Sequence, residues 1–167
     1  MNETTPKIKP LKGVSYEQFK EFLDSLDEER KSWSLDLQHH KNDKEFYENT
    51  GYAIVCIYND KVIGFCGAWA IDLDLKIIEV SFVVKKDYQG QGIGTMLLKK
   101  RDWDAKIEDV KYITAKHYKD NIASHKAFLK AGYEEWTFDK ITREDCAYFY
   151  RKEMVDDTFD WKIKEIV

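Results

Sequence analysis

The chain has 167 residues, of which 43% are apolar and 14% aromatic, so it can bury one core, and we expect a single domain over residues 1–167. Charged residues make up 35%, yet the net charge is only -4, so the two signs are interspersed and a nucleic-acid or membrane partner is disfavoured. No apolar run approaches the roughly 20 residues that cross a bilayer, and the start lacks a signal-peptide pattern, so we expect a soluble cytoplasmic protein. We expect it to be a monomer or a homodimer.

The first third of the chain is predicted to be helical after a short edge strand. Pro6 and Pro10 restrict the first ten residues to such an edge strand at most. Ser15 can cap a helix in which four apolar side chains recur at helical spacing, namely Phe19, Phe22, Leu23 and Leu26. A second helical stretch is expected over residues 27–40, with a less regular pattern. Residues 1–50 match no specific motif.

Three segments rich in β-branched and aromatic residues follow. They cover residues 52–58, 62–70 and 75–84. With a turn or loop between each pair, they predict an antiparallel meander.

The three cysteines show no spacing typical of a zinc site or a disulfide framework. A two-residue turn at positions 59 and 60 would place Cys56 opposite Ile63 and Cys66 opposite Ala53, so these two would not be partners. Together with Cys146 they are expected to be buried reduced thiols.

A predicted buried strand passes through three glycines into a helix over residues 92–106. Gly90, Gly92 and Gly94 allow a tight turn and a close approach to a ligand, and the first amides of the helix have no internal partner. Such a segment binds anions, and a pyrophosphate fits it. A dinucleotide fingerprint is excluded because Thr95 stands where glycine or alanine is required, and a P-loop because no lysine ends the loop.

The helix after the glycines is expected to turn four side chains inward: Ile93, Met96, Leu97 and Trp103. The later elements are predicted to be a strand over 111–115, a helix over 121–131 closed by Gly132, and strands over 133–139 and 146–154. Residues 155–167 stay unassigned. Strand, helix and strand in succession imply a parallel crossover beside the meander, so the sheet should be mixed.

Two motifs resemble the signatures of a known enzyme family. The run Gln89-x-x-Gly92-x-Gly94 after an apolar strand is similar to the acyl-coenzyme A loop of the GCN5-related N-acetyltransferases, the GNAT family. The segment from Asn121 to Tyr133, an Asn-capped helix that ends in Gly-aromatic, resembles the family's other signature. The motif core covers residues 77–133, with a looser match in strand order to about residue 150.

The resemblance implies an α/β (α+β) fold with a mixed, mostly antiparallel central sheet of about six to seven strands, helices on both faces, and a splay between the fourth and fifth strands. It also implies acetyl-CoA as acyl-donor substrate and transfer of the acetyl group to a primary amine of a small molecule or a peptide N-terminus. The edge from Phe82 to Val84 would pair with the pantetheine arm as a neighbouring strand does. The residues implied for the coenzyme are Phe82, Val83, Val84, Gln89, Gly90, Gln91, Gly92, Ile93, Gly94, Thr95, Asn121, Ser124 and Phe128.

The leaving thiolate needs stabilisation or a proton. Many family members use a tyrosine seven residues after the capping asparagine, but that position is Phe128 here. Ser124 is the first candidate instead, because a serine there without the tyrosine resembles the branch that acetylates protein N-termini. Alternatively, Ser124 fills a gap or bonds a backbone carbonyl. His125, on the same helix stripe, is the other candidate, and like His117 it can equally have no chemical role.

A general base is expected on the middle strand, where Glu79 stands among apolar residues. In histone-acetylating relatives a glutamate of this strand deprotonates the amine, but the matching position here is Ile78, so Glu79 faces the other way unless a β-bulge shifts the register. Glu79 is the candidate base or amine ligand, with a salt bridge or an exposed position as the alternative. Asp72 and Asp74 are further possible contacts for a cationic acceptor. No metal site is expected, since His39-His40 point about 100° apart on a helix.

The sequence therefore predicts an N-acetyltransferase that works by direct attack in a ternary complex. None of the cysteines lies in either motif, which disfavours a covalent enzyme. The alternative is a catalytically inactive acyl-CoA-binding module, kept open by the missing tyrosine. An unrelated nucleotide-binding α/β protein is the third interpretation.

Overall fold

A seven-stranded sheet forms the centre of the protein, which is described here from a computed structural model over residues 5–49, 53–72, 74, 76–107, 110–136 and 146–151. The strand order is β1-β2-β3-β4-β5-β7-β6, and every neighbouring pair is antiparallel except the parallel pair β4 and β5. The strands are β1 Lys7–Pro10, β2 Ile54–Tyr58, β3 Lys61–Asp72, β4 Ile77–Val84, β5 Tyr112–Tyr118, β6 Tyr133–Trp136 and β7 Cys146–Arg151. The predicted mixed sheet is confirmed.

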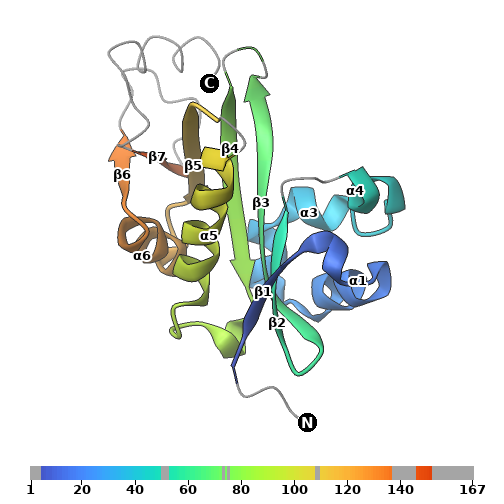
Figure 1. The fold of residues 1–167 in the computed structure, drawn as a ribbon. Coiled ribbons are helices and arrows are strands. Elements are labelled where there is room, and N and C mark those ends of the chain that lie inside the picture. The colour runs from blue at the N-terminus through green and yellow to red at the C-terminus, as the bar shows by residue number, and fades with distance from the viewer. Residues whose placement is uncertain are drawn as a thin grey trace.

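Helices cover both faces of the sheet. They are α1 Tyr16–Ser25, α2 Glu28–Trp33, α3 Leu35–His39, α4 Lys44–Asn49, α5 Ile93–Ile107 and α6 Ile122–Lys130, with 3-10 turns at Leu11–Gly13 and Lys86–Tyr88. Figure 1 shows α5 and α6 on one side of the strands and α1, α3 and α4 on the other. Among the described residues, no helix combines the length and the apolarity needed to cross a membrane.

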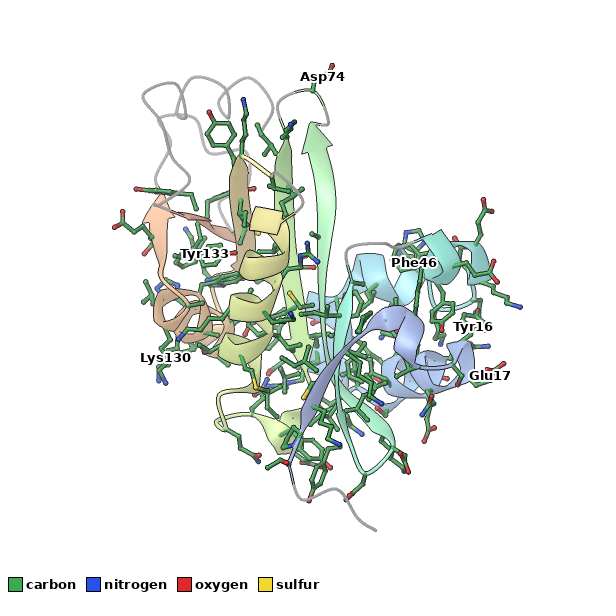
Figure 2. All side chains as sticks on the ribbon, in the orientation of Figure 1. Tyr16, Glu17, Phe46, Asp74, Lys130 and Tyr133 are labelled. Atoms are coloured by element: carbon green, nitrogen blue, oxygen red, sulfur yellow. The ribbon has the colours of Figure 1, made fainter. Side chains whose placement is uncertain are left out.

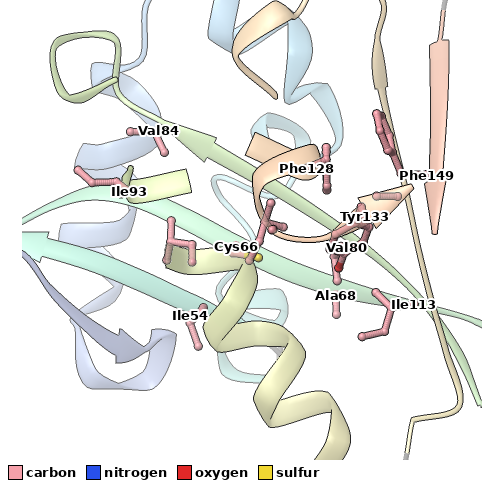
Figure 3. Close-up of a cluster of buried hydrophobic side chains, with 14 of the residues drawn as sticks. Ile54, Cys66, Ala68, Val80, Val84, Ile93, Ile113, Phe128, Tyr133 and Phe149 are labelled. Atoms are coloured by element: carbon pink, nitrogen blue, oxygen red, sulfur yellow. The ribbon is translucent and has the colours of Figure 1, made fainter. Parts of the chain in front are cut away.

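Each face of the sheet has its own apolar core. Alternate residues of β4 serve the two cores, because side chains along a strand point to opposite faces. Ile78, Val80 and Val84 join the core under α5 and α6, whereas Val83 joins the core under α1 with Phe65. Figure 3 shows the first core, in which side chains of α6, β6 and β7 gather around the middle strands.

The N-terminal helices differ from the predicted pair. The first helix is confirmed, with Phe19, Phe22 and Leu23 buried. The predicted helix over residues 27–40 is wrong as a single element, because the chain leaves helical geometry at Ser34 (φ −125°, ψ 38°), whose Oγ donates to the carbonyl of Arg30 at 2.6 Å. α4 was not predicted.

The cysteine register is also corrected. Asn59 and Asp60 have positive φ values of 49° and 60° and form the expected turn between β2 and β3. However, a bulge after Cys56 shifts the register by one residue, so Cys56 pairs with Gly64 rather than Ile63, and Cys66 with Ile54 rather than Ala53. All three cysteines are buried and free, as expected.

Two further details differ from expectation. Met96 is 38% exposed instead of inward, and Leu98 takes its place in the core beside Leu97. β5 extends to Tyr118 instead of ending at residue 115, because β7 lies between β5 and β6 and pairs with β5. His117 therefore lies inside the strand. The side chain of Trp103 and residues 137–145 and 152–167 lie outside the described residues, so the predicted ends of the last two strands at 139 and 154 and the tail 155–167 are not tested.

β4 and β5 stay paired for only part of their length. The parallel register runs from Ile77 with Tyr112 to Val80 with Ala115, after which the strands diverge. The β5-facing edge of Phe82–Val84 therefore has no partner strand in the part of the chain that the structure describes. The predicted splay between the fourth and fifth strands is where it was expected.

The first helix is held at its start by a capping box. The Gln18 N–H donates to Ser15 Oγ at 3.1 Å, and the Ser15 N–H donates to Gln18 Oε1 at 2.9 Å. We expect Ser15→Ala to lower the free energy of unfolding by about 1 kcal/mol in urea denaturation. Ser32→Ala is the matched control, since its Oγ only bonds back to the Glu29 carbonyl within α2. Equal effects of the two changes would contradict a capping role.

Candidate active site

Two adjoining cavities lie at the divergence of β4 and β5. The larger, of about 650 Å³, is lined by residues of β4, β5 and α6 and by α2 and α3. The smaller, of about 350 Å³, lies between the glycine loop and α6. They share four lining residues: Phe82, Val84, Gln89 and Ala123. One ligand can therefore extend from the loop into the larger cavity.

The glycine loop has the conformation of an anion cradle. Gly90 and Gly92 have φ values of 76° and 80°, and a Cβ at either would meet no atom within 4 Å, so both backbones face open space. The backbone N–H groups from Gly90 to Thr95 make no hydrogen bond to another described residue. A diphosphate fits these donors at the start of α5. Gly94 serves packing instead, because a Cβ there would lie 2.7 Å from the Phe82 ring.

Two lysines of α6 face the smaller cavity opposite the loop. Lys126 and Lys130 are four residues apart, so both side chains lie on one face of α6, and both line the cavity. Their ammonium groups place positive charge on the side of the cavity that faces the loop, where it would suit phosphate groups. Lys126 and Lys130 were not among the residues predicted from the sequence, although their spacing of four residues on the predicted helix places both side chains on one face.

The start of α6 brings a hydroxyl into the larger cavity. Asn121 caps the helix, its Oδ1 accepting from the Ser124 N–H at 3.1 Å. Ser124 is only 6% exposed and lines the cavity, yet its Oγ bonds no other described residue, so the carbonyl-bonded alternative is wrong. Phe128 is 1% exposed and meets Phe82 edge to face at 5.4 Å between ring centroids.

Glu79 lies in the cavity although it faces away from Ile78. The register with β3 is continuous from Val84 to Ile78, so no bulge turns Glu79 toward the face of α5 and α6. The carboxylate nevertheless lines the larger cavity, and its Oε1 lies 3.7 Å from Lys116 Nζ on β5. The cavity thus opens on both faces of the sheet, with Glu79 on one and Ser124 on the other.

His117 and His125 form a hydrogen-bonded pair. Nδ1 of His117 lies 2.6 Å from the Tyr118 carbonyl, which can only accept, so this nitrogen carries the proton. Nε2 of His117 lies 3.1 Å from His125 Nδ1, and His125 Nε2 lies 3.8 Å from a Glu135 oxygen. Burial, the largest cause, lowers the pKa of His117 despite the Tyr118 carbonyl. In the neutral state both His117 nitrogens are therefore occupied, by the carbonyl and by the His125 N–H.

Some predicted residues lie away from the cavities. His125 lies behind His117 and lines neither cavity, and Gln91 is exposed at the outside of the loop. Asp74 is exposed at the tip of the β3–β4 hairpin, as Figure 2 shows. The side chain of Asp72 lies outside the described residues. The catalytic roles of Ser124, Glu79 and His125, and the assigned coenzyme contacts, stay predictions.

Two further lining residues were missed by the sequence analysis. Arg30 of α2 is 6% exposed, and its Nη2 donates to Gln89 Oε1 at 2.7 Å. Cys146 at the start of β7 is 4% exposed and lies in the wall of the larger cavity. Neither belongs to a periodic pattern or a motif, so no signal in the sequence pointed to them.

Comparison with known families agrees with this geometry. A family model described as the acetyltransferase (GNAT) family matches residues 17–133. The chain belongs to the GNAT acetyltransferase family. Its acyl donor is acetyl-CoA. No curated protein matches the chain.

Solved structures share the GNAT fold with this protein at low sequence identity. The GNAT domain of S. lividans PAT has a TM-score of 0.69 at 15% identity, with 87% of this chain and 89% of that chain covered. Ribosomal-protein-alanine N-acetyltransferase from Brucella melitensis has a TM-score of 0.69 at 19% identity, covering 87% and 98%. The acetyltransferase yncA from Salmonella typhimurium, solved with its cofactor acetyl-CoA, has a TM-score of 0.66 at 18% identity, covering 87% and 92%.

The lowered pKa of His117 makes stability depend on pH. The unfolded chain binds a proton near pH 6.5 while the folded chain does not, so this contribution is complete above about pH 6.5 and is lost as the pH falls toward the folded pKa. We expect the free energy of unfolding to rise as the pH increases from the lowered pKa of folded His117 toward about 7, and His117→Gln to flatten that rise. Urea denaturation at several pH values measures both. An unchanged slope in the variant would show that His117 is not the group responsible.

The carboxylates with lowered pKa values do not interfere in this window. Asp24, Asp27 and Asp43 all shift downward from an ordinary value of 3.8. Their stabilising contributions are therefore present above that value and are lost only at a lower pH than the His117 contribution.

Proposed function

We propose that this acetyltransferase transfers the acetyl group to a primary amine, of a small molecule or of a peptide N-terminus, by direct attack in a ternary complex. The observation that carries the proposal is the continuity of the two cavities across the splay, with Glu79 on one face of the sheet and Ser124 on the other. The coenzyme enters from the glycine loop, and the acceptor from the side of α2 and α3.

In the proposed reaction, Glu79 and Ser124 of the larger cavity act at different steps of acyl transfer. Bound acetyl-CoA supplies an activated thioester carbonyl. Glu79 receives the proton that the amine loses as its nitrogen forms the new bond to the acetyl carbon. Ser124 Oγ donates a hydrogen bond to the sulfur as the carbon–sulfur bond breaks, where Phe128 cannot. Burial of Ser124, which is 6% exposed, strengthens its hydrogen bond. CoA leaves as a thiolate that takes a proton from solvent, and Glu79, which is 24% exposed, returns the amine proton to solvent.

Lys116 supports the proposed role of Glu79. Its ammonium lies 3.7 Å from the Glu79 carboxylate within the cavity lining, so that carboxylate already accommodates a primary ammonium group. An acceptor amine that took the place of the Lys116 ammonium group would lie beside the same Glu79 carboxylate. Two of the structural neighbours are named as ribosomal-protein alanine acetyltransferases, at 19% and 16% identity, a likeness that extends to the fold alone.

The proposed activity is tested by incubating the protein with acetyl-CoA and a panel of amines. The panel contains peptides with a free N-terminus, the same peptides with a blocked N-terminus and an internal lysine, polyamines and aminoglycosides. Release of free CoA thiol gives turnover, and the mass of the product identifies the acetylated amine. CoA binding without turnover on any amine would instead favour an inactive CoA-binding module, which the family match does not support.

The same experiment separates direct attack from a covalent route. Cys146 lies in the cavity wall, so an acetyl-cysteine intermediate would form there if a thiol took part. Direct attack predicts that protein quenched with acid during turnover carries no acetyl group on Cys146, read by peptide mass spectrometry. It also predicts that turnover persists in Cys146→Ser.

We expect Gly92→Val to weaken CoA binding by at least tenfold, or about 1.4 kcal/mol, because the new side chain enters the smaller cavity. Isothermal titration with CoA gives the affinity. Gly132→Val is the matched control for backbone strain, since Gly132 also has a positive φ of 92° but lines neither cavity. Unchanged affinity in folded Gly92→Val would remove the loop from the site.

The Ser124 hypothesis predicts a kinetic defect without a binding defect. A hydrogen bond that strengthens as the thiolate develops lowers the barrier, so Ser124→Ala should lose roughly ten- to a hundredfold in kcat, or about 1.5 to 3 kcal/mol, with CoA affinity unchanged. His125→Ala is measured beside it by the same titration and assay. Wild-type turnover in Ser124→Ala would mean that the serine only packs, and a slow His125→Ala alone, with a lost step near pH 6.5, would move the role to the histidine.

A further inference from the structure

The helix α2 is attached to the protein through an arginine. A short helix usually depends on the burial of an apolar face, because six residues cannot hold helical structure alone. In α2, Glu28–Trp33, the only buried residue is Arg30. The polar bonds of Arg30 therefore determine where this helix lies.

Arg30 bonds in two directions. Its Nη1 donates to Asp27 Oδ2 at 3.0 Å and to Glu29 Oε1 at 3.3 Å, both next to it in the chain, and its guanidinium carbon lies 5.5 Å from the centre of the Trp33 ring. Its Nη2 donates to Gln89 Oε1 at 2.7 Å, on the coenzyme loop. Asp27 and Glu29 provide the negative charge that a buried Arg30 needs. The bond to the neutral Gln89 side chain therefore fixes the position of Arg30 relative to the loop and does not neutralise its charge.

The position of the Gln89 side chain depends on the backbone conformation of the glycine loop. Gln89 directly precedes Gly90, whose φ is 76°, and it lines both cavities. Its Nε2 also lies 3.5 Å from the Val84 carbonyl at the end of β4. Among the described residues, the bond from Arg30 to Gln89 is the one side-chain hydrogen bond that joins α2 or α3 to this loop. A ligand that fixes the loop backbone thus also fixes the acceptor of the Arg30 bond.

The other end of this connection is the wall of the larger cavity. Trp33 of α2 and Leu37 of α3 line that cavity and not the smaller one. The guanidinium carbon of Arg30 lies over the ring of Trp33 at 5.5 Å, so a shift of Arg30 changes the surroundings of that ring. Occupancy of the coenzyme loop and the shape of the acceptor side are linked through a single buried side chain.

We propose that Arg30 is a positioning residue that couples the two subsites, so that a nucleotide bound at the glycine loop sets α2 and α3 for the acceptor amine. The coupling rests on the proposed function, because it takes the larger cavity as the acceptor site. Linkage is reciprocal, so an acceptor held by the wall of α2 and α3 also tightens binding at the loop.

The test uses fluorine NMR of protein labelled with 5-fluorotryptophan and adenosine 3′-phosphate 5′-diphosphate as the probe. This nucleotide carries the phosphates of CoA but no pantetheine arm, so it occupies the loop and does not reach Trp33. Five tryptophan signals are expected, and Trp33→Phe identifies one of them. In the wild type the Trp33 signal should shift with the same midpoint as nucleotide binding measured by calorimetry. Binding without that shift overturns the coupling, while no binding at all overturns the coenzyme site itself.

Three variants test whether the shift of the Trp33 signal depends on the hydrogen bond between Arg30 and Gln89. Arg30→Met removes the donor, and Gln89→Leu removes the acceptor while leaving the ion pairs of Arg30 in place. At saturating nucleotide both should lose the Trp33 shift, and Gln89→Glu, which retains an acceptor oxygen, should keep it. If Arg30→Met does not fold, as judged by circular dichroism, Gln89→Leu decides alone. A wild-type shift in Gln89→Leu overturns the proposal, since a purely structural arginine would not depend on its loop partner.

Discussion

The site depends on the point at which two parallel strands stop pairing. β4 and β5 share a register of four residue pairs and then separate, which leaves the edge of Phe82–Val84 without a strand partner among the described residues. Exposed backbone of this kind is a template for an extended ligand. Both ligand-binding segments follow directly from it, since the glycine loop continues β4 and the cap of α6 continues β5. Ligands of open α/β sheets bind at such carboxyl ends of strands for the same reason.

The core under α5 and α6 keeps this opening in place. Phe128 stacks on His117 and Phe149 and meets Tyr133 edge to face, so the position that many relatives give to a tyrosine belongs here to an aromatic cluster. Figure 3 shows Phe128 beside Phe149 and above the strands of this core. One turn earlier, Ser124 keeps its hydroxyl in the cavity. The packing thus leaves a polar group in the cavity wall beside a buried aromatic cluster.

The sequence predicted those parts of the structure that depend on local rules. The tight turn at Gly90 and Gly92, the cap at Asn121 and the turn at Asn59 follow from residue type and its neighbours, and all three were predicted. The bulge after Cys56 and the break at Ser34 are local, but residue type does not specify them: Ser34 ends the helix through the bond of its Oγ to the Arg30 carbonyl four residues earlier. The insertion of β7 beside β5 depends on contacts between distant segments, which no local pattern encodes. The same reason explains why Arg30 was missed, because its partner Gln89 lies 59 residues away.

The placement of charge is consistent with two ligands in the two adjoining cavities. The coenzyme side carries the loop amides with Lys126 and Lys130, which suit phosphates, while the acceptor side carries Glu79, which suits an ammonium group. The backbone of β4 separates these regions, because successive side chains point to opposite faces of the sheet. In the proposed reaction, an amine would approach the acetyl group from the face opposite the thiol. Phosphates and ammonium would each meet charge of the opposite sign, which favours binding of both ligands at the same time.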